Sequence, residues 1–551
     1  MERTVVEYVL KCLKQVGVTD VFGVPGDFAF PLNDAICNDK DMRWIGCCNE
    51  LNAAYAADGY ARIKGAAALC TTYGVGELSA LCGVAGSYTE HLPIFHLVGM
   101  PNTGIQREHR LVHHTLGNGE FDLFAKMAQP AVCASAVLTP EIVVSEMERL
   151  IHAAFYHRRP VYIALPTDHA EAAPCGCDII RPASVASDPE SLADAVAAVA
   201  EKLRTAGTGV ILAGYLLQRL GLSAKAQAFV AASGLPYATM FMDKTALDES
   251  SPGYIGMYDG RIMNPEVRQF VESRDVVLNF GGLWSDFNTG AFTARIEPSR
   301  GIDIMHHHVR VGRAVYPNVE MADMLEALSG LCIKKKLAGP AAGGLEQPEG
   351  ALEDLISPEY LYPRWQQFLR PGDILVTETG TASMGLGFAL MPSGSVFLNQ
   401  TLWGSIGWAT PASFGASMAA PNRRVILVTG EGSHQLTVQE ISQFQRFGLK
   451  PIIFCLNNQG YLIERLLCKD PMSAYNDVAQ WNYSQLPAAF GCQDWFTAKV
   501  TTNGELDAAI RQAETCGQGA YIEVVTGMMA SSPLALAFNH SIQTLYGKKE
   551  H

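Results

Sequence analysis

The sequence has little charge, few cysteines for its length and no long apolar run. Only 17% of its 551 residues are charged and 48% are hydrophobic, which is the opposite of the composition of disordered chains. No apolar run reaches 18 residues, so no membrane span is expected. The net charge is −14 and the basic residues form no cluster, which argues against a nucleic-acid partner.

Fourteen cysteines in a chain of this length do not form a disulfide scaffold. Cys47 and Cys48 are adjacent, and Cys175 is one residue from Cys177, so neither pair has the spacing of a zinc site. The pattern from Val5 onward predicts an amphipathic helix and not a signal peptide. We therefore expect a soluble, cytoplasmic protein.

Short apolar runs rich in β-branched residues alternate with helical patterns along most of the chain. Such runs are typical of strands buried on both faces of a parallel sheet. The clearest are 161–165, 209–213, 275–278, 424–428 and 451–456. Segments dense in Pro and Gly, 173–191 and 334–358, separate three blocks. The sequence predicts an α/β protein of three domains, 1–180, 190–335 and 355–551, with parallel sheets flanked by helices.

Two polar clusters follow neighbouring strands in the third block. The first is Gly430-Glu431-Gly432-Ser433, where two glycines allow close approach of a ligand and the next helix begins with free N–H groups. The second contains Asn458 and the carbonyl of Gly460. Hard oxygen ligands of this kind suit Mg²⁺ on a diphosphate. Both clusters follow strand ends, where open α/β sheets bind ligands.

The first block contains a further set of candidate residues. Asp27 lies in a turn after the expected strand 20–24, Glu50 begins an Ala-rich helix, and His113-His114 lie in a polar loop. Each also has a plain explanation. Glu50 can complement a helix dipole, and adjacent histidines are often solvated. A zinc site at His113-His114 is disfavoured because no third ligand follows at the right spacing.

Two other patterns carry no functional prediction. The run His306-His307-His308 follows an expected strand and is read as an exposed strand end without a metal partner. Gly207-Thr208-Gly209 precedes a strand, whereas a dinucleotide-binding loop follows one, so no NAD site is expected there.

Longer motifs resemble one enzyme family over nearly the whole chain. They are Gly23–Asp27, Asn49–Ala61, Gly74–Ser79, His113–Gly117, Ser285–Gly290, Glu378–Thr381, Leu402–Gly407, Glu431–Ser433 and Asn457-Asn458. Together they resemble the pyruvate decarboxylase and indolepyruvate decarboxylase group of thiamine diphosphate enzymes. The resemblance implies decarboxylation of a 2-oxo acid to an aldehyde and CO₂, with thiamine diphosphate and Mg²⁺ as cofactors. It also implies that the three domains are the pyrimidine-binding, middle and diphosphate-binding domains.

The resemblance assigns a role to each candidate. Glu50 hydrogen-bonds the aminopyrimidine ring, and Ile406 wedges the cofactor into a bent shape. Glu431, Asn458 and the Gly460 carbonyl hold Mg²⁺. The catalytic set is Asp27, Glu50, His113, His114 and Glu464. The cofactor-binding set is Pro25, Gly26, Glu50, Thr72, Val75, Thr379, Thr381, Gly404, Ser405, Ile406, Gly430, Glu431, Gly432, Ser433, Asn458, Gly460, Tyr461, Leu462 and Ile463.

One residue departs from the family pattern: Glu431 stands where Asp is usual, which lengthens the ligand by one methylene. Mg²⁺ is still expected to bind. The resemblance further implies that the site forms between two subunits, so that a homodimer is the minimum and a homotetramer is expected.

The substrate pocket by resemblance consists of Phe287, Ser383, Met384, Ile463 and Leu467, and the residues do not rank pyruvate against longer, branched or aromatic 2-oxo acids. Two alternatives stay open, a carboligase or synthase and a non-catalytic scaffold. The His113-His114 pair opposes the first, and the presence of Glu50 and Asn458 opposes the second.

Overall fold

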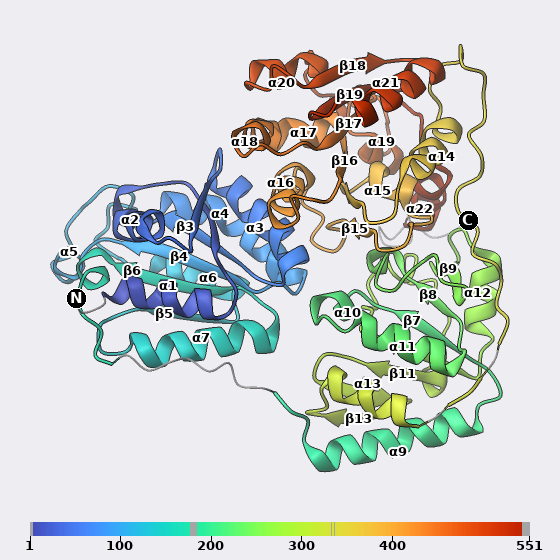
Figure 1. The fold of residues 1–551 in the computed structure, drawn as a ribbon, viewed down its shortest axis with the longest axis horizontal. Helices are drawn as coiled ribbons and strands as arrows, with labels where there is room; N and C mark the ends of the chain where they lie inside the picture. The colour runs from blue at the N-terminus through green and yellow to red at the C-terminus, as the bar shows by residue number, and fades with distance from the viewer. Residues whose placement is uncertain (1–3, 177–184, 332, 336, 543–551) are drawn as a thin grey trace.

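The computed structural model describes residues 4–176, 185–331, 333–335 and 337–542. Three sheets follow one another along the chain, each flanked by helices (Figure 1). The first and third sheets are entirely parallel, and the middle sheet has two antiparallel strands at one edge. The predicted fold class is therefore confirmed. Residues 177–184 of the first expected linker lie outside the described residues, as do Lys336 of the second and the two ends of the chain, 1–3 and 543–551.

The first sheet has the strand order β2-β1-β3-β4-β6-β5. Its strands are β1 (Asp20–Gly23), β2 (Arg43–Gly46), β3 (Ala67–Thr72), β4 (Ile94–Met100), β5 (Ala134–Val137) and β6 (Val161–Pro166). The helices are α1 (Val5–Gln15), α2 (Phe30–Asn38), α3 (Glu50–Lys64), α4 (Val75–Thr89), α5 (Thr103–Arg107), α6 (Leu123–Ala128), α7 (Val143–His157) and α8 (Thr167–Ala170), with the 3₁₀ turns η1 (Asp27–Ala29) and η2 (Gln129–Ala131). Strands β3, β4 and β6 are buried along their whole length, which explains their continuous apolar runs.

The middle sheet has the order β13-β12-β11-β10-β7-β8-β9. Its strands are β7 (Gly209–Ala213), β8 (Tyr237–Thr239), β9 (Tyr254–Met257), β10 (Val276–Phe280), β11 (Gly301–Ile304), β12 (His308–Val311) and β13 (Ala314–Pro317). The helices are α9 (Pro189–Thr205), α10 (Leu216–Arg219), α11 (Ser223–Ser233), α12 (Pro265–Glu272) and α13 (Met321–Gly330), with η3 (Phe241–Asp243) and η4 (Pro298–Arg300).

The third sheet has the order β15-β14-β16-β17-β19-β18. Its strands are β14 (Ile374–Thr377), β15 (Val396–Leu398), β16 (Val425–Gly430), β17 (Ile452–Asn457), β18 (Phe496–Val500) and β19 (Ala520–Val525). The helices are α14 (Pro358–Phe368), α15 (Thr381–Leu386), α16 (Ala409–Ala419), α17 (Glu431–Thr437), α18 (Ile441–Arg446), α19 (Leu462–Leu467), α20 (Leu486–Ala489), α21 (Asn503–Thr515) and α22 (Pro533–Ile542), with η5 (Val438–Glu440), η6 (Ala474–Asn476) and η7 (Tyr483–Gln485).

Helices α3 and α16 join the first domain to the third (Figure 1). They approach so closely that a Cβ on Gly59 would lie 2.1 Å from the carbonyl oxygen of Ala412, and one on Gly415 would lie 1.8 Å from that of Ala56. Only glycine fits at either position. The Ala- and Gly-rich composition of this stretch of sequence is therefore explained by helix packing between domains.

A buried carboxylate reinforces the same contact. Asp58 accepts hydrogen bonds from Arg62 Nε at 2.7 Å, Ser87 Oγ at 2.9 Å and Trp408 Nε1 at 2.9 Å. Trp408 belongs to the third domain and the other three residues to the first. Because the carboxylate is fully buried, its three donors are needed to offset the loss of hydration.

Glu77, in the first turn of α4, is a second buried carboxylate, and its burial should make the stability of the protein depend on pH. Burial raises the pKa of Glu77 to about 7 from 4.5, although the Gly74 N–H and the Tyr162 hydroxyl both donate to its carboxylate. Protonated Glu77 therefore makes its full contribution to folding stability below about pH 4.5. This contribution is lost as the pH rises through about 7. Relative to the wild type, Glu77→Gln should gain about 1.4 kcal/mol of unfolding free energy per pH unit across this window. Urea unfolding at several pH values measures this, and parallel pH dependences would contradict it.

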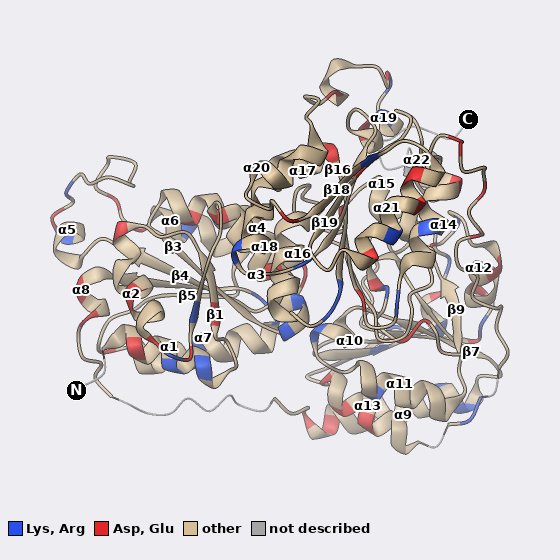
Figure 2. Ribbon diagram, turned by 45° about the horizontal axis from the view of Figure 1, so that its top comes forward, with Lys and Arg blue, Asp and Glu red and all other residues tan. Residues whose placement is uncertain are grey.

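Charges are dispersed over the surface. Figure 2 shows Lys and Arg interspersed with Asp and Glu along the described helices of all three domains. Within the described part of the chain, no helix combines the length and the apolar character that crossing a membrane requires.

Candidate active site

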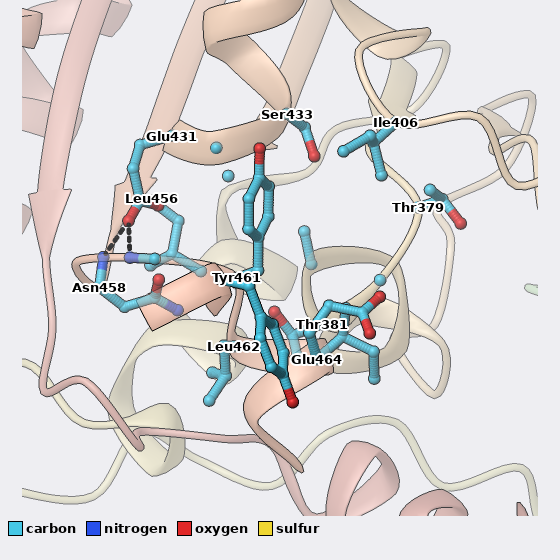
Figure 3. Close-up of a pocket in the computed structure, with 17 residues that line it drawn as sticks. Thr379, Thr381, Ile406, Glu431, Ser433, Leu456, Asn458, Tyr461, Leu462 and Glu464 are labelled. Atoms are coloured by element: carbon cyan, nitrogen blue, oxygen red, sulfur yellow. Dashed lines mark hydrogen bonds between the residues drawn. The ribbon is translucent and has the colours of Figure 1, made fainter. Parts of the chain in front are cut away.

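A cavity of about 440 Å³ lies in the third domain, where β14, β16 and β17 end. Its lining includes many of the expected site residues, namely Thr379, Thr381, Ile406, Gly430, Glu431, Gly432, Ser433, Asn458, Gly460, Tyr461, Leu462, Ile463 and Glu464 (Figure 3). The sequence did not point to four further lining residues, Gly380, Ala382, Leu456 and Tyr475. Of these, Gly380 lies within a quoted motif, and no local signal marks Tyr475.

Glu431 is the first residue of α17 and is almost fully buried. Its Oε1 accepts hydrogen bonds from the backbone N–H of Gly460 at 2.7 Å and of Asn458 at 3.2 Å (Figure 3). Burial raises the pKa of Glu431 to about 7 in spite of these donors. A buried carboxylate of this kind gains strongly from a nearby cation.

The oxygen atoms around Glu431 are suitable ligands for a hard cation. One terminal amide atom of Asn458 lies 3.2 Å from Glu431 Oε1 and 2.9 Å from the Gly460 carbonyl oxygen. With nitrogen in that position, the amide donates to both oxygens. With oxygen there, three oxygen atoms converge as they do around a bound metal ion. The arrangement therefore suits Mg²⁺ once the amide presents its oxygen.

The start of α17 is shaped by glycine. A Cβ on Gly432 would lie 2.5 Å from the Tyr461 ring, which stands inside the cavity in Figure 3. The first N–H groups of a helix have no carbonyl partner within it, so they are free for a ligand. Ser433 adds a hydroxyl group at the cavity wall, and Ile406 lies beside it with 37% of its surface exposed.

Two expected cofactor residues of the third domain are not part of this lining. The Ser405 hydroxyl lies 2.6 Å from the Tyr55 hydroxyl of the first domain, and the Gly404 N–H donates to the Gln400 carbonyl. Ser405 therefore serves the contact between the first and third domains, Gly404 bonds within its own loop, and only Ile406 of this loop reaches the cavity.

The first domain brings together a second group of expected residues. His113 Nε2 lies 2.6 Å from Asp27 Oδ2, and the His113 ring stacks on Phe28. Asp27, His113 and His114 all offer nitrogen or oxygen atoms within 4.8 Å of one another. Burial would raise the pKa of Asp27, but the His113 hydrogen bond and charge outweigh it and hold the pKa below its usual range. The cluster is a coupled acid and imidazole group suited to proton transfer.

Other expected residues of the first domain surround this cluster. Glu50 is the first helical residue of α3, and its Oε1 would lie 3.4 Å from a Cβ on Gly76. Gly26 lies against Thr72, with only 2.4 Å between a Cβ placed on Gly26 and the Thr72 Cβ. Pro25 and Val75 are exposed at the neighbouring surface.

Two buried polar atoms in this group are unsatisfied. Thr72 Oγ1 and His114 Nδ1 have no hydrogen-bond partner among the described residues. Buried polar groups are normally paired, so both atoms are suited to a polar ligand. The first domain therefore offers unpaired hydrogen-bonding atoms near Glu50, as a pyrimidine ring would require.

The start of α3 is held by the third domain. Glu440 accepts a hydrogen bond from the Cys48 N–H at 3.1 Å and another from Asn52 Nδ2 at 2.7 Å. These two residues flank Glu50 in sequence, so Glu440 fixes the turn that presents the Glu50 side chain. No local pattern indicates this contact, because Glu440 lies 392 residues from Cys48 along the chain.

Within the described part of one chain, the cavity around Glu431 includes only one of the two groups of residues. No residue of the first domain belongs to the described lining of the third-domain cavity. Asp27, Glu50, His113 and His114 therefore form one half of the expected site, and the residues around Glu431 form the other.

The expected substrate residues lie beside the cavity in an aromatic cluster. Phe287 stacks on Phe241 at 5.8 Å and on Phe538 at 4.8 Å between ring centroids. Met384 is buried in the same cluster, and Ile463 and Leu467 pack against it. Ser383 is buried, with its hydroxyl group donating to the Gly380 carbonyl. The sequence did not indicate Phe241 or Phe538, which reach the cluster only through tertiary packing.

The reading of His306-His307-His308 as an exposed strand end is wrong for two of the three residues. His306 and His307 are half-buried and stacked on each other, and only His308 is exposed. His307 Nδ1 lies 2.9 Å from Glu320, and its Nε2 lies 2.7 Å from the Tyr156 carbonyl oxygen of the first domain. Both ring nitrogens are occupied, so the cluster holds two domains together and does not offer His307 to a metal.

Comparison with known proteins agrees with this geometry. Three family models match: the N-terminal TPP binding domain of thiamine pyrophosphate enzymes over residues 3–122, the central domain over 196–331 and the C-terminal TPP binding domain over 369–524. An alpha-keto-acid decarboxylase of Mycobacterium leprae is 37% identical over 98% of this chain and 96% of its own. Pyruvate decarboxylase isozyme 1 of Saccharomyces cerevisiae is 39% identical over 92% of both chains.

A solved structure supports the fold. Benzoylformate decarboxylase from Polynucleobacter necessarius superposes with a TM-score of 0.80 at 19% identity, covering 96% of this chain and all of the other. At that identity the likeness concerns the fold alone. The three matching family models and the identity to full-length relatives show more: this chain belongs to the thiamine pyrophosphate enzyme family.

Proposed function

We propose that the protein is a thiamine diphosphate-dependent decarboxylase that converts a 2-oxo acid to an aldehyde and CO₂. The observation that carries the proposal is the contact of 2.6 Å between His113 and Asp27. The same chain has, in its third domain, the oxygen atoms around Glu431 that would bind a cation. The names of the relatives, alpha-keto-acid and pyruvate decarboxylase, support the same reaction.

The cofactor fits the residues present. Thiamine diphosphate, when bound, supplies the electron sink for the carbanion that remains after CO₂ leaves. Glu431, Asn458 and the Gly460 carbonyl would hold Mg²⁺, and Ser433 and the N–H groups near Gly432 would contact the diphosphate. Glu50 would hold the pyrimidine end through a charge-assisted hydrogen bond.

The cluster of Asp27, His113 and His114 would act in proton transfer. After decarboxylation, a proton must reach the reacting carbon before an aldehyde can leave. Asp27 holds His113 by a hydrogen bond and His114 is adjacent, so the three residues can store and deliver that proton. Glu464 belongs to the cavity lining of the third domain and would complete the set from the opposite side.

A prediction distinguishes this role from a structural one. His113→Ala and His114→Ala should each slow aldehyde release by about 10²- to 10⁴-fold, which is the range of a general acid–base contribution. The share of carboligation products should rise, because a carbanion that is not protonated can react with a second carbonyl compound. Gas chromatography of aldehyde and hydroxyketone products measures both effects. Product ratios and rates equal to those of the wild type would contradict the assignment and favour a carboligase.

We further propose that the complete site forms between two copies of the chain. In one chain the two half-sites are separate, and a cofactor with two ends needs both. Exposed apolar side chains flank each half, namely Val75 and Leu78 in the first domain and Leu402, Trp403 and Ile406 in the third. Such exposure is typical of an interface. A homodimer is the minimum assembly, and we propose a homotetramer of two such dimers.

The aromatic cluster supports a broad substrate range. Met384 is deformable, and it packs in one apolar cluster with Phe241, Phe287 and Phe538 beside the cavity. We propose that 2-oxo acids with branched or aromatic side chains are accepted along with pyruvate.

The proposal also assigns a role to each domain and a cellular compartment to the protein. The domains are taken as 1–180 for pyrimidine binding, 190–335 for the middle and 355–551 for diphosphate binding. The described cysteines other than Cys12 are free thiols, which supports a cytoplasmic enzyme.

The test is an assay of aldehyde and CO₂ with thiamine diphosphate, Mg²⁺ and a panel of 2-oxo acids from pyruvate to indolepyruvate. Equal amounts of aldehyde and CO₂ from at least one substrate are expected. Formation of hydroxyketones as the main product would favour a carboligase, and the absence of any cofactor-dependent CO₂ release would favour a scaffold.

A further inference from the structure

Arg465 is a fully buried arginine beside the cation-binding turn. It lies on α19, only 1% of its surface is exposed, and it follows Glu464 directly. Its guanidinium donates to three acceptors: Pro471 O at 2.5 Å, Gln459 O at 3.1 Å and Asp477 Oδ1 at 2.6 Å. Burying a charged guanidinium costs free energy unless its N–H groups form hydrogen bonds. These contacts therefore favour one position of the 459–460 turn relative to Arg465.

One peptide unit is held at both ends. The carbonyl of Gln459 accepts from Arg465 Nη2 at 3.1 Å, and the N–H of the same peptide, on Gly460, donates to Glu431 Oε1 at 2.7 Å. The peptide dipole thus lies between two charged groups, with its carbonyl toward the Arg465 guanidinium and its N–H toward the Glu431 carboxylate. Both contacts therefore favour a single orientation of this peptide.

The backbone of the turn would not keep this orientation by itself. Gln459 has φ +65° and Gly460 has φ +146°, both in the left-handed region that disfavours most residues. The guanidinium also packs on the turn, since a Cβ on Gly460 would lie 2.7 Å from Arg465 Nη2. The Gly460 carbonyl belongs to the next peptide, whose N–H on Tyr461 donates to the Asn476 carbonyl at 2.8 Å. Arg465 holds the loop that carries Asn476 through its contacts with Pro471 and Asp477. Because glycine rotates freely, loss of these contacts would let the Gly460 carbonyl point away from Glu431 and Asn458.

We infer that Arg465 is the positioning residue of the cation site. It holds the peptide before Gly460 directly and the peptide after Gly460 through the 471–477 loop, so that the Gly460 carbonyl faces the metal ion together with Glu431 and Asn458. The inference rests on the proposed function, because it assumes that a divalent cation binds there. Arg465 does not touch the reacting atoms, so its loss should weaken metal binding and leave the chemical step of the loaded enzyme largely unchanged.

Two substitutions and one matched control test the inference. Arg465→Lys keeps the charge, but one ammonium group cannot bridge Gln459, Pro471 and Asp477 as the guanidinium fork does. Arg465→Met removes the charge and retains an apolar stem. Asp477→Asn is the control: it weakens an ion pair whose carboxylate is 60% exposed and leaves the Gln459 contact in place.

Binding is measured directly as loss of the free Mn²⁺ signal in electron paramagnetic resonance, with thiamine diphosphate present. Residues that orient metal ligands typically contribute about 10- to 100-fold to affinity. Both Arg465 variants should bind Mn²⁺ about 10- to 100-fold more weakly than the wild type, with Asp477→Asn within about 3-fold. Their kcat at saturating Mg²⁺ should stay within about 3-fold, while the Mg²⁺ concentration for half-maximal activity rises in parallel with the Mn²⁺ dissociation constant.

The outcomes separate the two ideas. If the wild type binds Mn²⁺ and both Arg465 variants bind it equally well, the positioning role is wrong and the proposed function stands. If the wild type binds no Mn²⁺ with thiamine diphosphate, the proposed cation site itself is wrong. If both variants lose their folded circular dichroism spectrum, Arg465 acts on the fold alone and the inference is overturned.

Discussion

Replacing Glu50 with glutamine is expected to lower the decarboxylation rate by about 10²- to 10⁴-fold, the range of a general acid–base contribution. Glutamine has the same shape and can still form a hydrogen bond, but it cannot supply the negative charge that the pyrimidine end of the cofactor requires. Since the helix start is held by Glu440 through Cys48 and Asn52, the geometry of this segment should survive the change.

The stability of the Glu50→Gln protein should change little. A carboxylate in the first turn of a helix contributes only about 0.3–1 kcal/mol, so the melting temperature should fall by a few degrees at most. Glu190→Gln is the matched control, since Glu190 lies in the first turn of α9 and is exposed. That variant should keep full activity. A Glu50→Gln enzyme with near-normal turnover would rule out the proposed mechanism.

Replacing Glu431 with glutamine should have the second large effect. The Gln side-chain oxygen can keep both backbone hydrogen bonds, from Gly460 and Asn458. The neutral side chain also avoids the cost of the buried charge that raises the pKa of Glu431 to about 7. The cofactor-free variant should therefore be as stable as the wild type or more so, as measured by thermal unfolding.

Metal binding should nevertheless collapse in Glu431→Gln. Loss of the one charged ligand should weaken Mg²⁺ binding by roughly 100-fold or more, because a hard cation depends on carboxylate charge. Glu431→Asp provides the comparison, since it keeps the charge and shortens the side chain by one methylene. It should retain metal-dependent activity. Equal Mg²⁺ affinity in Glu431→Gln and in the wild type, measured by calorimetry with thiamine diphosphate, would remove Glu431 from the metal site.

The sequence was most informative where local pattern and strand order coincide. Glu431 and Asn458 follow adjacent parallel strands, β16 and β17, so their proximity could be predicted from two apolar runs and the rule for strand ends. The runs themselves correspond to buried strands because burial on both faces leaves no polar position in them.

Contacts that depend on tertiary packing could not be predicted in this way. Phe538 belongs to the C-terminal helix and reaches Phe287 of the middle domain only in the folded chain. Arg465 reads in sequence as an ordinary basic residue of a short helix, and its burial depends on the 471–477 loop closing over it. Ser405 matches a family motif, but its hydroxyl group faces Tyr55. Local patterns carry no information on such partners.

The central claim is that Glu50 of one chain serves the Glu431 site of another. The most direct test is to mix Glu50→Gln and Glu431→Gln subunits by co-expression and to assay decarboxylation. Random pairing yields about half mixed dimers, each with one intact site and one doubly altered site, so activity should recover to about a quarter of the wild-type value. The double variant Glu50→Gln/Glu431→Gln should stay inactive. A mixture with no more activity than either single variant, in mixed dimers confirmed by mass spectrometry, would contradict a site shared between two chains.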